Sequence, residues 1–435
     1  MTPTAFIPAL ASALRLSDLR SRLLFTLGIL VLFRFVAHVP VVRVDTEVFR
    51  RLFQQSQLLG MLNLFSGGAM ENLSIAAMGV YPYITATIVM QILTAMVPAL
   101  QALSKEGEAG RTRINLYTHW IMVPLAAVQG FAQLQLVQSL GLISGVGVIG
   151  GSLWPTLVMV LSMTAGTVLL VWLGELITEY GIGNGVSLII FSGIVAGLPA
   201  FVGQSLVGGT NLVALVPFVA IGAGIVYAIV IFNEAQRRVP VQYSRSTMRG
   251  GRVFRQGGTT HIPLKVNMAG MIPLLFALTL MMLPQTLLSP FAASNVGWVR
   301  TLANGVTQTL GQSSPVYWAL YFLLVVGFTF FYTLIIFQQQ NLAESLQTNG
   351  GFVPGIRPGR ATADYLNGIL NRITWAGALF LGGVAVTPYL AELFTGVRSL
   401  QLSSTGLLIV VGVVLDTMKQ LEAQLLMRRY QGFLS

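Results

Sequence analysis

The stretch GMLNLFSGGA at residues 60–69, followed by an apolar run at residues 75–98, decides how this chain is organised. About 20 apolar residues are enough to cross a bilayer, so the second run can span the membrane and the first is left over. The first piece is short, apolar and broken by Gly67 and Gly68. Broken backbone at membrane depth is tolerated only where protein or a water-filled cavity shields it. We therefore predict an enclosed cavity with a short movable element inside it.

The composition is that of a polytopic membrane protein. The 435 residues are 54% hydrophobic and 9% charged, with a mean hydropathy of +0.75, whereas about a quarter of the residues of a soluble protein are charged. The sequence contains no cysteine, which excludes disulfides and thiolate metal sites. Residues 1–22 lack a basic-then-apolar signal sequence and are expected to form a short amphipathic helix at the membrane interface.

The apolar runs predict an all-α fold with ten membrane-spanning helices. The spans are expected at residues 23–41, 73–98, 114–139, 153–177, 186–206, 212–232, 269–292, 316–338, 372–395 and 404–427.

The net charge of +11 follows this topology and does not indicate a nucleic-acid partner by itself. If the N-terminus lies in the cytoplasm, 19 of the 25 lysines and arginines fall in cytoplasmic segments. The six exceptions are Arg34, Arg43, Arg50, Arg51, Arg300 and Arg398. Because cytoplasmic loops of membrane proteins carry an excess of lysine and arginine, we expect both termini in the cytoplasm.

The ten spans divide into an N-terminal half at residues 1–206 and a C-terminal half at residues 207–435. An odd number of spans per half means that the halves, if they are repeats, are inverted, and inverted repeats commonly place a pathway at their interface. Spans two and seven hold matching positions, and Pro82 and Pro273 interrupt them near their starts. Such interruptions favour a pathway lined by these two spans, although prolines are also common in membrane helices without such a role.

Two cytoplasmic loops are long. Residues 233–268 contain two alternating β-branched or aromatic stretches around residues 248–251, which predicts a basic β-hairpin. Residues 339–371 contain NGGFVPGIRPGRATADYLNGIL, which predicts a tip structured by glycine and proline and then a short helix. Loops held in this way commonly carry function.

Seven segments, in order along nearly the whole chain, carry a family resemblance. They are LNLFSGGA (62–69), PYITATIVMQ (82–91), KEGEAGRTRINLYT (105–118), EYGIGNGVSLIIFSGIVAGLP (179–199), HIPLKVNMAGMIP (261–273), FVPGIRPG (352–359) and LLIVVGVVLD (407–416). Together they resemble the SecY family, which forms the central channel of the general protein-secretion machinery. The loop motifs are most similar to those of bacterial members.

The resemblance implies an hourglass pore between the two five-helix halves, with a waist of aliphatic side chains that we call the pore ring. By position, the ring falls on Ile84, Ile88, Ile190, Leu275 and Ile409. A hydrophobic constriction blocks ions by dewetting, and it can still deform around a passing chain. The family mostly has isoleucine where this chain has Leu275, and leucine keeps the apolar seal. Without the resemblance, each of these residues is an ordinary aliphatic of a membrane helix.

The leftover piece, about residues 61–72, is implied to be a plug that fills the external funnel at rest. We call it the plug segment, and its expected members are Leu62, Asn63, Leu64, Phe65, Ser66, Gly67 and Gly68. The glycine pair would let it hinge. The alternative is a re-entrant structural loop.

Spans two and seven are implied to be the two sides of a lateral gate that opens toward lipid. Gln91 and Asn267 match polar gate positions of the family. A polar side chain inside the membrane is costly and prefers a partner across an interface. The alternative is simple hydrogen bonding between neighbouring helices.

Arg357, at the tip of FVPGIRPG, matches an arginine that in the family contacts the cytosolic partner, either the SecA motor ATPase or the translating ribosome. A guanidinium on a stiff tip presents a fixed fork to carboxylate or phosphate. The same docking role is expected for Arg360, Arg237, Arg238, Arg245, Arg249, Arg252 and Arg255. Phosphates of ribosomal RNA suit such a basic surface. The alternative is that these charges only set the topology.

The resemblance also implies the remaining partners and the location. A SecE-type subunit would clamp the two halves, and a SecG-type subunit would be an accessory in the bacterial plasma membrane. The substrates would be unfolded precursor proteins, whose apolar segments leave sideways into lipid. A signal sequence would bind between spans two and seven and favour the open state, to the extent of its differential affinity for that state.

Other signals are weaker. The run GIGNG at residues 181–185 has no preceding strand, so it does not indicate a nucleotide site. Glu175 and Glu179 could bind a coupling ion, but charges at a helix end that face water are favoured. Arg34 and His38 could serve a proton relay, but an internal structural pair is favoured.

We expect neither an enzyme nor a cofactor or metal site, because the sequence shows no catalytic triad, nucleotide-binding loop or metal-ligand spacing. The main rival to a channel is an ion-coupled secondary transporter, which also uses inverted repeats and broken helices. A transporter needs charged or strongly polar groups near the midplane. Spans two, five, seven and ten offer mainly aliphatic residues there, with Gln91 as the main exception.

Overall fold

A computed structural model describes most of the chain. The described residues are 16–41, 63, 66–139, 153–207, 212–249, 252–288, 291, 296–311, 314–340, 342–395 and 400–431. The predicted interfacial helix at residues 1–22 falls largely outside them.

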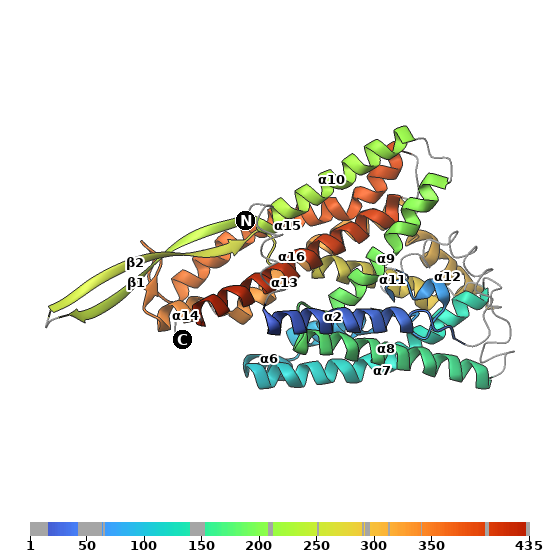
Figure 1. Ribbon diagram of the computed structural model, residues 1–435, viewed down its shortest axis with the longest axis horizontal. Helices are drawn as coiled ribbons and strands as arrows, with labels where there is room; N and C mark the ends of the chain where they lie inside the picture. Colours follow the sequence, from blue (N-terminus) through green and yellow to red (C-terminus); the bar gives the residue numbers. More distant parts are fainter. Residues whose placement is uncertain are drawn as a thin grey trace. The chain divides into compact units, whose positions relative to one another are not determined.

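The described chain is mainly helical, with one long β-hairpin (Figure 1). In chain order the elements are α2 (Ser17–Val36), η2 (Met70–Asn72), α5 (Tyr81–Met96), α6 (Pro98–Lys105), α7 (Glu108–Ser139), α8 (Leu153–Tyr180), α9 (Gly185–Val207), α10 (Leu212–Glu234), β1 (Gln236–Arg249), β2 (Arg252–Lys265), α11 (Ile272–Leu288), α12 (Gly297–Thr309), α13 (Pro315–Gln340), α14 (Leu342–Thr348), β3 (Gly351–Phe352), α15 (Arg360–Thr395) and α16 (Leu400–Gln431).

Each of the ten predicted spans overlaps one of these helices, which confirms the all-α membrane fold. By length and composition, the described residues contain four helices fit to cross a membrane, at Glu108–Gln138, Leu153–Tyr180, Pro315–Thr348 and Arg360–Thr387. A bent pair made of α5 and α6 is a fifth candidate. The number of ten crossings stays a prediction.

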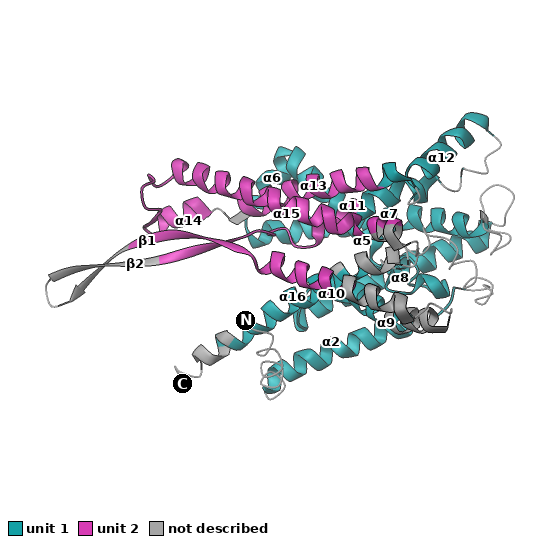
Figure 2. Ribbon diagram, turned by 90° about the horizontal axis from the view of Figure 1, so that it is seen from above, with its two compact units in different colours: residues 1–221, 278–317, 405–435 teal, residues 222–277, 318–404 magenta. Residues whose placement is uncertain are grey.

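The chain forms two compact units (Figure 2). Unit 1 comprises Met1–Ile221, Leu278–Tyr317 and Thr405–Ser435, and unit 2 comprises Gly222–Ala277 and Trp318–Ser404. Unit 1 takes segments from both predicted halves. The units therefore do not test the inverted repeat or its boundary near residue 207, and both stay predictions.

The second predicted span differs from the expected single run at 73–98. Residues 75–80 form turns, and α5 begins only at Tyr81, with Pro82 in its first turn. Proline is tolerated there because that backbone N–H has no partner within the helix. The helix stops at Met96, since Val97 is extended before Pro98. The chain then bends by 100° into α6.

Close helix contacts hold unit 1 together around the turns that precede α5. Helix α8 packs against α2, α7 and α9, and α7 packs against α5. A Cβ on Gly166 of α8 would lie 2.1 Å from the carbonyl oxygen of Ile75. A glycine is therefore required for α8 to approach this turn so closely. The start of α5 is fixed against the bundle in this way.

Unit 2 contains the predicted hairpin. Strands β1 and β2 pair antiparallel from Gln236↔Lys265 to Arg249↔Arg252, which confirms the hairpin and its turn. The end of the hairpin nearest α10 and α11 shares a hydrophobic core with α13, α14, α15 and the loop between α14 and α15. The buried members of this core are Val239, Val241, Leu264, Phe337, Leu346, Val353, Leu366 and Leu370.

The loop at residues 339–371 is also part of this core. Strand β3 joins the hairpin through the pairs Gln242↔Phe352 and Tyr243↔Gly351, which makes a three-stranded sheet of order β2-β1-β3. The prediction of a short helix followed by a separate span was wrong, because α15 runs without a break from Arg360 to Thr395. No proline or glycine pair interrupts residues 360–372, so the helix continues into the span. The two long loops thus form one body, which we call the loop platform.

Replacing Val241 with aspartate is expected to loosen the loop platform by several kcal/mol, because an unpaired carboxylate would be buried among aliphatic side chains. Val241 is 0% exposed. Limited trypsin cleavage at the hairpin arginines of the purified chain should then become faster. The control is Thr260→Asp, which adds the same charge at the exposed residue opposite Val241 in the register. Equal cleavage of the two variants would contradict the platform.

Candidate functional site

The plug segment is described at residue 63 and from residue 66 onward, and Leu62, Leu64 and Phe65 lie outside the described residues. Hydrogen bonds within the segment stabilise its local conformation. The backbone N–H of Gly68 donates to the carbonyl of Asn63 (3.0 Å), and that of Met70 donates to Oγ of Ser66 (3.0 Å). The N–H of Glu71 donates to Oδ1 of Asn63 (3.2 Å).

The segment lies against the turn of α9 that carries Ile190, a predicted member of the pore ring. A Cβ on Gly67 would lie 3.2 Å from the carbonyl oxygen of Ile189 on α9 and 2.6 Å from the ring of Phe33 on α2. Gly67 and Gly68 both have positive φ values, +65° and +87°, which only glycine adopts readily. Ile190, a predicted member of the pore ring, follows Ile189 directly in α9.

All five predicted ring residues are buried. The exposed fractions are 6% for Ile84, 4% for Ile88, 1% for Ile190, 6% for Leu275 and 1% for Ile409. Four of these residues belong to unit 1, and Leu275 belongs to unit 2. Closure of the ring across the two units therefore stays a prediction.

Sequence reasoning missed two glutamines of α7 that hold the plug region and α5. Gln129 donates from Nε2 to Oγ1 of Thr85 on α5 (3.2 Å), and Gln133 donates to Sδ of Met70 in η2 (2.7 Å). They are 3% and 2% exposed. Two amides one helical turn apart in an apolar span are a signal that could have found them, since membrane helices use such groups to bind one another.

The predicted gate residues lie in different units. Gln91 is a partly buried residue of α5 in unit 1. Asn267 is 8% exposed in unit 2, where its Nδ2 donates to Oδ1 of Asn233 at the end of α10 (2.7 Å). Within the described residues, the buried Oδ1 of Asn267 accepts no hydrogen bond. Pairing of the two gate residues stays a prediction.

The predicted docking arginines belong to the loop platform of unit 2. Arg357 is exposed between Gly355 (φ +83°) and Gly359 (φ +99°). Its carbonyl accepts a hydrogen bond from Oγ1 of Thr362 (2.9 Å), which ties the tip to the first turn of α15. Arg360 starts that helix and is exposed, as are Arg237 and Arg238 at the root of the hairpin. The side chains of Arg245, Arg249, Arg252 and Arg255 lie outside the described residues.

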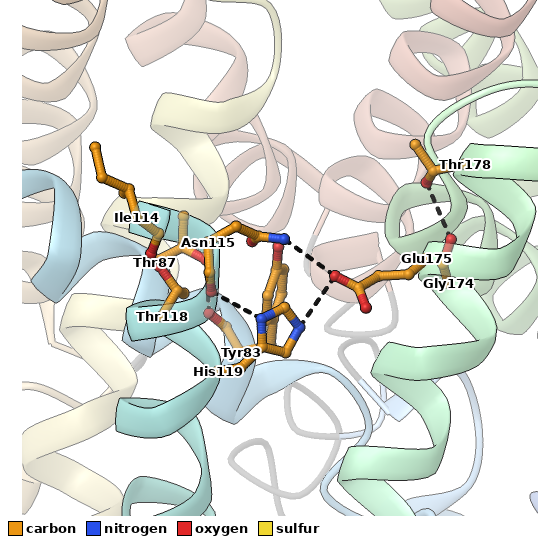
Figure 3. A network of polar contacts seen from close by, with 9 residues as sticks. All are labelled: Tyr83, Thr87, Ile114, Asn115, Thr118, His119, Gly174, Glu175 and Thr178. Carbon is orange, nitrogen blue, oxygen red and sulfur yellow. Dashed lines mark hydrogen bonds and ion pairs between the residues drawn. The ribbon is translucent and has the colours of Figure 1, made fainter. Parts of the chain in front are cut away.

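Glu175 is part of a polar network between α7 and α8 and does not simply face water (Figure 3). One of its oxygens, Oε1, lies 3.1 Å from Nε2 of His119 and accepts a hydrogen bond from Nδ2 of Asn115 (3.2 Å). The His119 ring also lies 5.7 Å from the ring of Tyr83 on α5. Because Glu175 is 42% exposed, the pair contributes little to stability, about 0–1 kcal/mol. The network joins α7 to α8, and the His119 ring also contacts α5.

The described residues contain no group of three or more histidines, aspartates and glutamates that could hold a metal ion. Arg34 and His38 do not form a relay with one another through their side chains. Nδ1 of His38 bonds the backbone carbonyl of Arg34 (2.7 Å), while Nη1 of Arg34 donates to the carbonyl of Gly67 (3.1 Å). The favoured structural pair is thus a local backbone contact, and the guanidinium serves the plug segment.

Comparisons with known proteins point to one family. A model of the SecY family matches residues 74–418 of the chain. The protein translocase subunit SecY of Streptomyces galbus is 42% identical over 442 residues, which cover 98% of this chain and 100% of that protein. The protein translocase subunit SecY of Thermus thermophilus is 43% identical over 440 residues, with coverage of 99% and 98%.

Solved structures share the fold. A SecY structure, described by a plug domain that stabilises the closed state and maintains a membrane seal, has a TM-score of 0.63 at 17% identity. Sec61 in a canine ribosome-channel complex has a TM-score of 0.61 at 18% identity. Each match covers 93% of this chain and 92% of the other. At these identities the likeness concerns the fold alone.

Proposed function

This chain belongs to the SecY family and is a multi-pass membrane protein that forms a protein-conducting channel, and we propose how its parts move unfolded secretory precursors across the membrane. The observation that carries the proposal is the position of the plug segment, which lies on the turn of α9 next to a buried residue of the pore ring. A plug beside an aliphatic constriction is the arrangement of a closed channel that opens for a chain.

The pore ring of Ile84, Ile88, Ile190, Leu275 and Ile409 acts as the seal. The five side chains are 1–6% exposed, and apolar side chains that avoid water are what such a seal requires. The ring excludes ions by dewetting. Aliphatic side chains bind an extended polypeptide without directional bonds, so the ring fits any sequence that passes.

The lateral gate is formed by α5 and α11, with Gln91 and Asn267 on its two sides. An amide oxygen of Asn267 that is buried and accepts no hydrogen bond within the described residues supports this role, because such a group gains from a partner across the seam. A signal sequence would bind at the gate and favour the open state. Apolar segments of the precursor would leave there into lipid.

The loop platform receives the cytosolic partner. Arg357 is exposed on a tip bounded by two glycines of positive φ, and Arg237, Arg238 and Arg360 are exposed on the same unit. One core and one sheet join the two loops, so a partner that binds both meets a preformed surface. We expect the SecA motor ATPase to bind through carboxylates and the ribosome through RNA phosphates, since guanidinium groups suit both.

The membrane partners are a SecE-type subunit that clamps the two halves and a SecG-type accessory subunit. We expect the membrane to be the bacterial plasma membrane, with both termini in the cytoplasm. The placement of 19 of the 25 lysines and arginines supports this orientation. The energy for transport comes from the motor or from translation. An ion-coupled transporter is not favoured, because the buried positions at the proposed waist are aliphatic.

Site-specific photo-crosslinking tests this assignment. A photoreactive side chain is placed at Ile88, and a precursor is stalled halfway across proteoliposomes that hold the chain with its membrane partners. We expect an adduct between the stalled precursor and position 88. The control is the same side chain at Trp172 of α8, which is 54% exposed and faces away from the bundle. Adducts of equal yield at both positions, or none at position 88, would contradict the assignment.

A further inference from the structure

Gly67 of the plug segment is held by two residues on different helices, Arg34 of α2 and Gly193 of α9. We propose that Arg34 and Gly193 form a latch that holds the plug segment in its closed position and so sets how readily the channel opens. Arg34 donates a hydrogen bond from its charged guanidinium group. Gly193 has no side chain, so the backbone of Gly67 can pack directly on α9 there, a contact that we call the seat. The inference rests on the proposed function, in which residues 61–72 are the plug, and it assigns positioning residues to that plug.

The seat is a direct approach of two backbones. A Cβ on Gly193 would lie 1.9 Å from Cα of Gly67, a distance that no real Cβ atom can occupy. The ring of Phe33, which is 0% exposed, also packs close to Gly67. Any larger residue at position 193 would push the plug segment off α9. The two glycines therefore specify where the segment rests.

The bond from Arg34 gives this partly buried cation a function. Nη1 of Arg34 donates to the carbonyl of Gly67, 33 positions further along the chain (3.1 Å). An arginine within a membrane span is costly and is expected to serve function, with backbone carbonyls among its usual partners. A hydrogen bond with a charged donor is about twice as strong as a neutral one. Gln133 and Asn72, which also hold this region through Met70 and Ala37, offer only neutral amides.

Directly after the plug segment, backbone hydrogen bonds fix residues 73–75 in place. The plug segment can therefore move relative to this fixed point. The N–H of Val41 donates to the carbonyl of Leu73 (3.0 Å), and the N–H of Ile75 donates to the carbonyl of Val39 (3.1 Å). Leu73 has a φ of +38°, an unusual value for a residue with a side chain. Backbone pairs hold residues 73–75 to residues 39–41, which follow α2. Among the contacts of Gly67 with other helices, the bond from Arg34 is the hydrogen bond to its backbone.

The latch has a direct consequence for gating. A signal sequence must favour the open state by more than the latch favours the closed state. Removal of the guanidinium should therefore raise the population of the open state even without a precursor. Arg34→Lys should restore most of the closed population, because an ammonium is also a charged donor.

Cysteine labelling tests the latch, and the chain offers a clean background because it has no cysteine. Ser66→Cys places a nearly isosteric thiol at a residue of the plug segment that is 0% exposed. The full chain with its membrane partners is treated with a membrane-impermeant maleimide from the external side. Arg34→Gln and Gly193→Ala are each added to Ser66→Cys, and halide efflux from proteoliposomes is measured in parallel.

We expect Arg34→Gln to label about tenfold faster or more, the factor that the loss of a hydrogen bond to a charged group implies. Gly193→Ala should also make labelling of Ser66→Cys faster. The matched control is Gly197→Ala, one turn further along α9, where an added Cβ would meet no atom within 4 Å. Arg34→Lys and Gly197→Ala should label at the parent rate, which a general loss of folding in α2 or α9 would not predict.

Three failures can be told apart. If a translocating precursor speeds labelling of Ser66→Cys but Arg34→Gln does not, the plug moves and the latch is wrong. If Gly197→Ala labels as fast as Gly193→Ala, the seat is wrong. If a translocating precursor leaves the labelling of Ser66→Cys unchanged, the proposed plug is wrong, and the latch with it.

Discussion

Replacing Arg357 with glutamate is expected to abolish motor-driven translocation while leaving the channel folded. Arg357 is exposed on a tip fixed by Gly355, Gly359 and the bond from Thr362, so the variant changes the docking surface and leaves every core in place. Loss of a central interface arginine costs at least about 2 kcal/mol, and the opposite charge adds repulsion. Docking should weaken by about a hundredfold, and ATP-dependent protection of a precursor should fall to background.

The control for this variant is Arg111→Glu. Arg111 is also exposed and expected in the cytoplasm, but it lies near the start of α7 in unit 1 and is not part of the loop platform. Both changes reverse one charge, so an effect of net charge alone would appear in both. Parent-like transport by Arg357→Glu, or equal losses in the two variants, would show that these arginines only set the topology.

Replacing Ile409 with asparagine is expected to make the resting channel leak and to admit precursors with defective signal sequences. Ile409 is 1% exposed, so the amide would enter an aliphatic seal and attract water. A buried amide without partners also raises the free energy of the closed state. If the closed state becomes about 1.4 kcal/mol less stable relative to the open state, the ratio of open to closed channels rises about tenfold. Halide efflux from proteoliposomes and transport of a precursor with a defective signal measure the two effects.

The same helix provides the control. Val414 of α16 is 40% exposed, so Val414→Asn makes a similar chemical change away from the proposed ring. Leu275→Asn in α11 should behave like Ile409→Asn, with Leu280→Asn as its control, since Leu280 is 39% exposed. If the Ile409→Asn channel leaks no more halide than the parent and still rejects defective signal sequences, Ile409 is not part of the pore ring.

Much of the fold could be predicted because each signal is local. Apolar runs predicted the ten helices, and alternation around residues 248–251 predicted the hairpin and its turn. The predictions failed where tertiary contacts determine at which residue a helix begins. Residues 75–80 are apolar enough to join the second span, but they form turns that pack on Gly166 of α8. The continuous helix α15 was missed because its polar first turns seemed to belong to a loop.

The site could be predicted only in part, since its residues act through partners far along the chain. Gly67 and Gly68 indicated a hinge, and both do have positive φ values. The contact of Gly67 with Gly193 and its bond from Arg34 could not be read from sequence, because they join positions that no local pattern relates. The same is true of Gln133 and Met70, and of the β3 pairing that joins the two long loops.

We propose that this chain is a channel for unfolded precursors, which a cytosolic motor drives across the membrane. The most direct test is made in proteoliposomes that hold the chain with a SecE-type partner, to which SecA, ATP and a radiolabelled secretory precursor are added. We expect the precursor to become protected from protease only when ATP is present. If a well-folded complex with an active matched motor gives no protected precursor, and the same vesicles take up small solutes along an ion gradient, the chain is a transporter and not a channel for precursors.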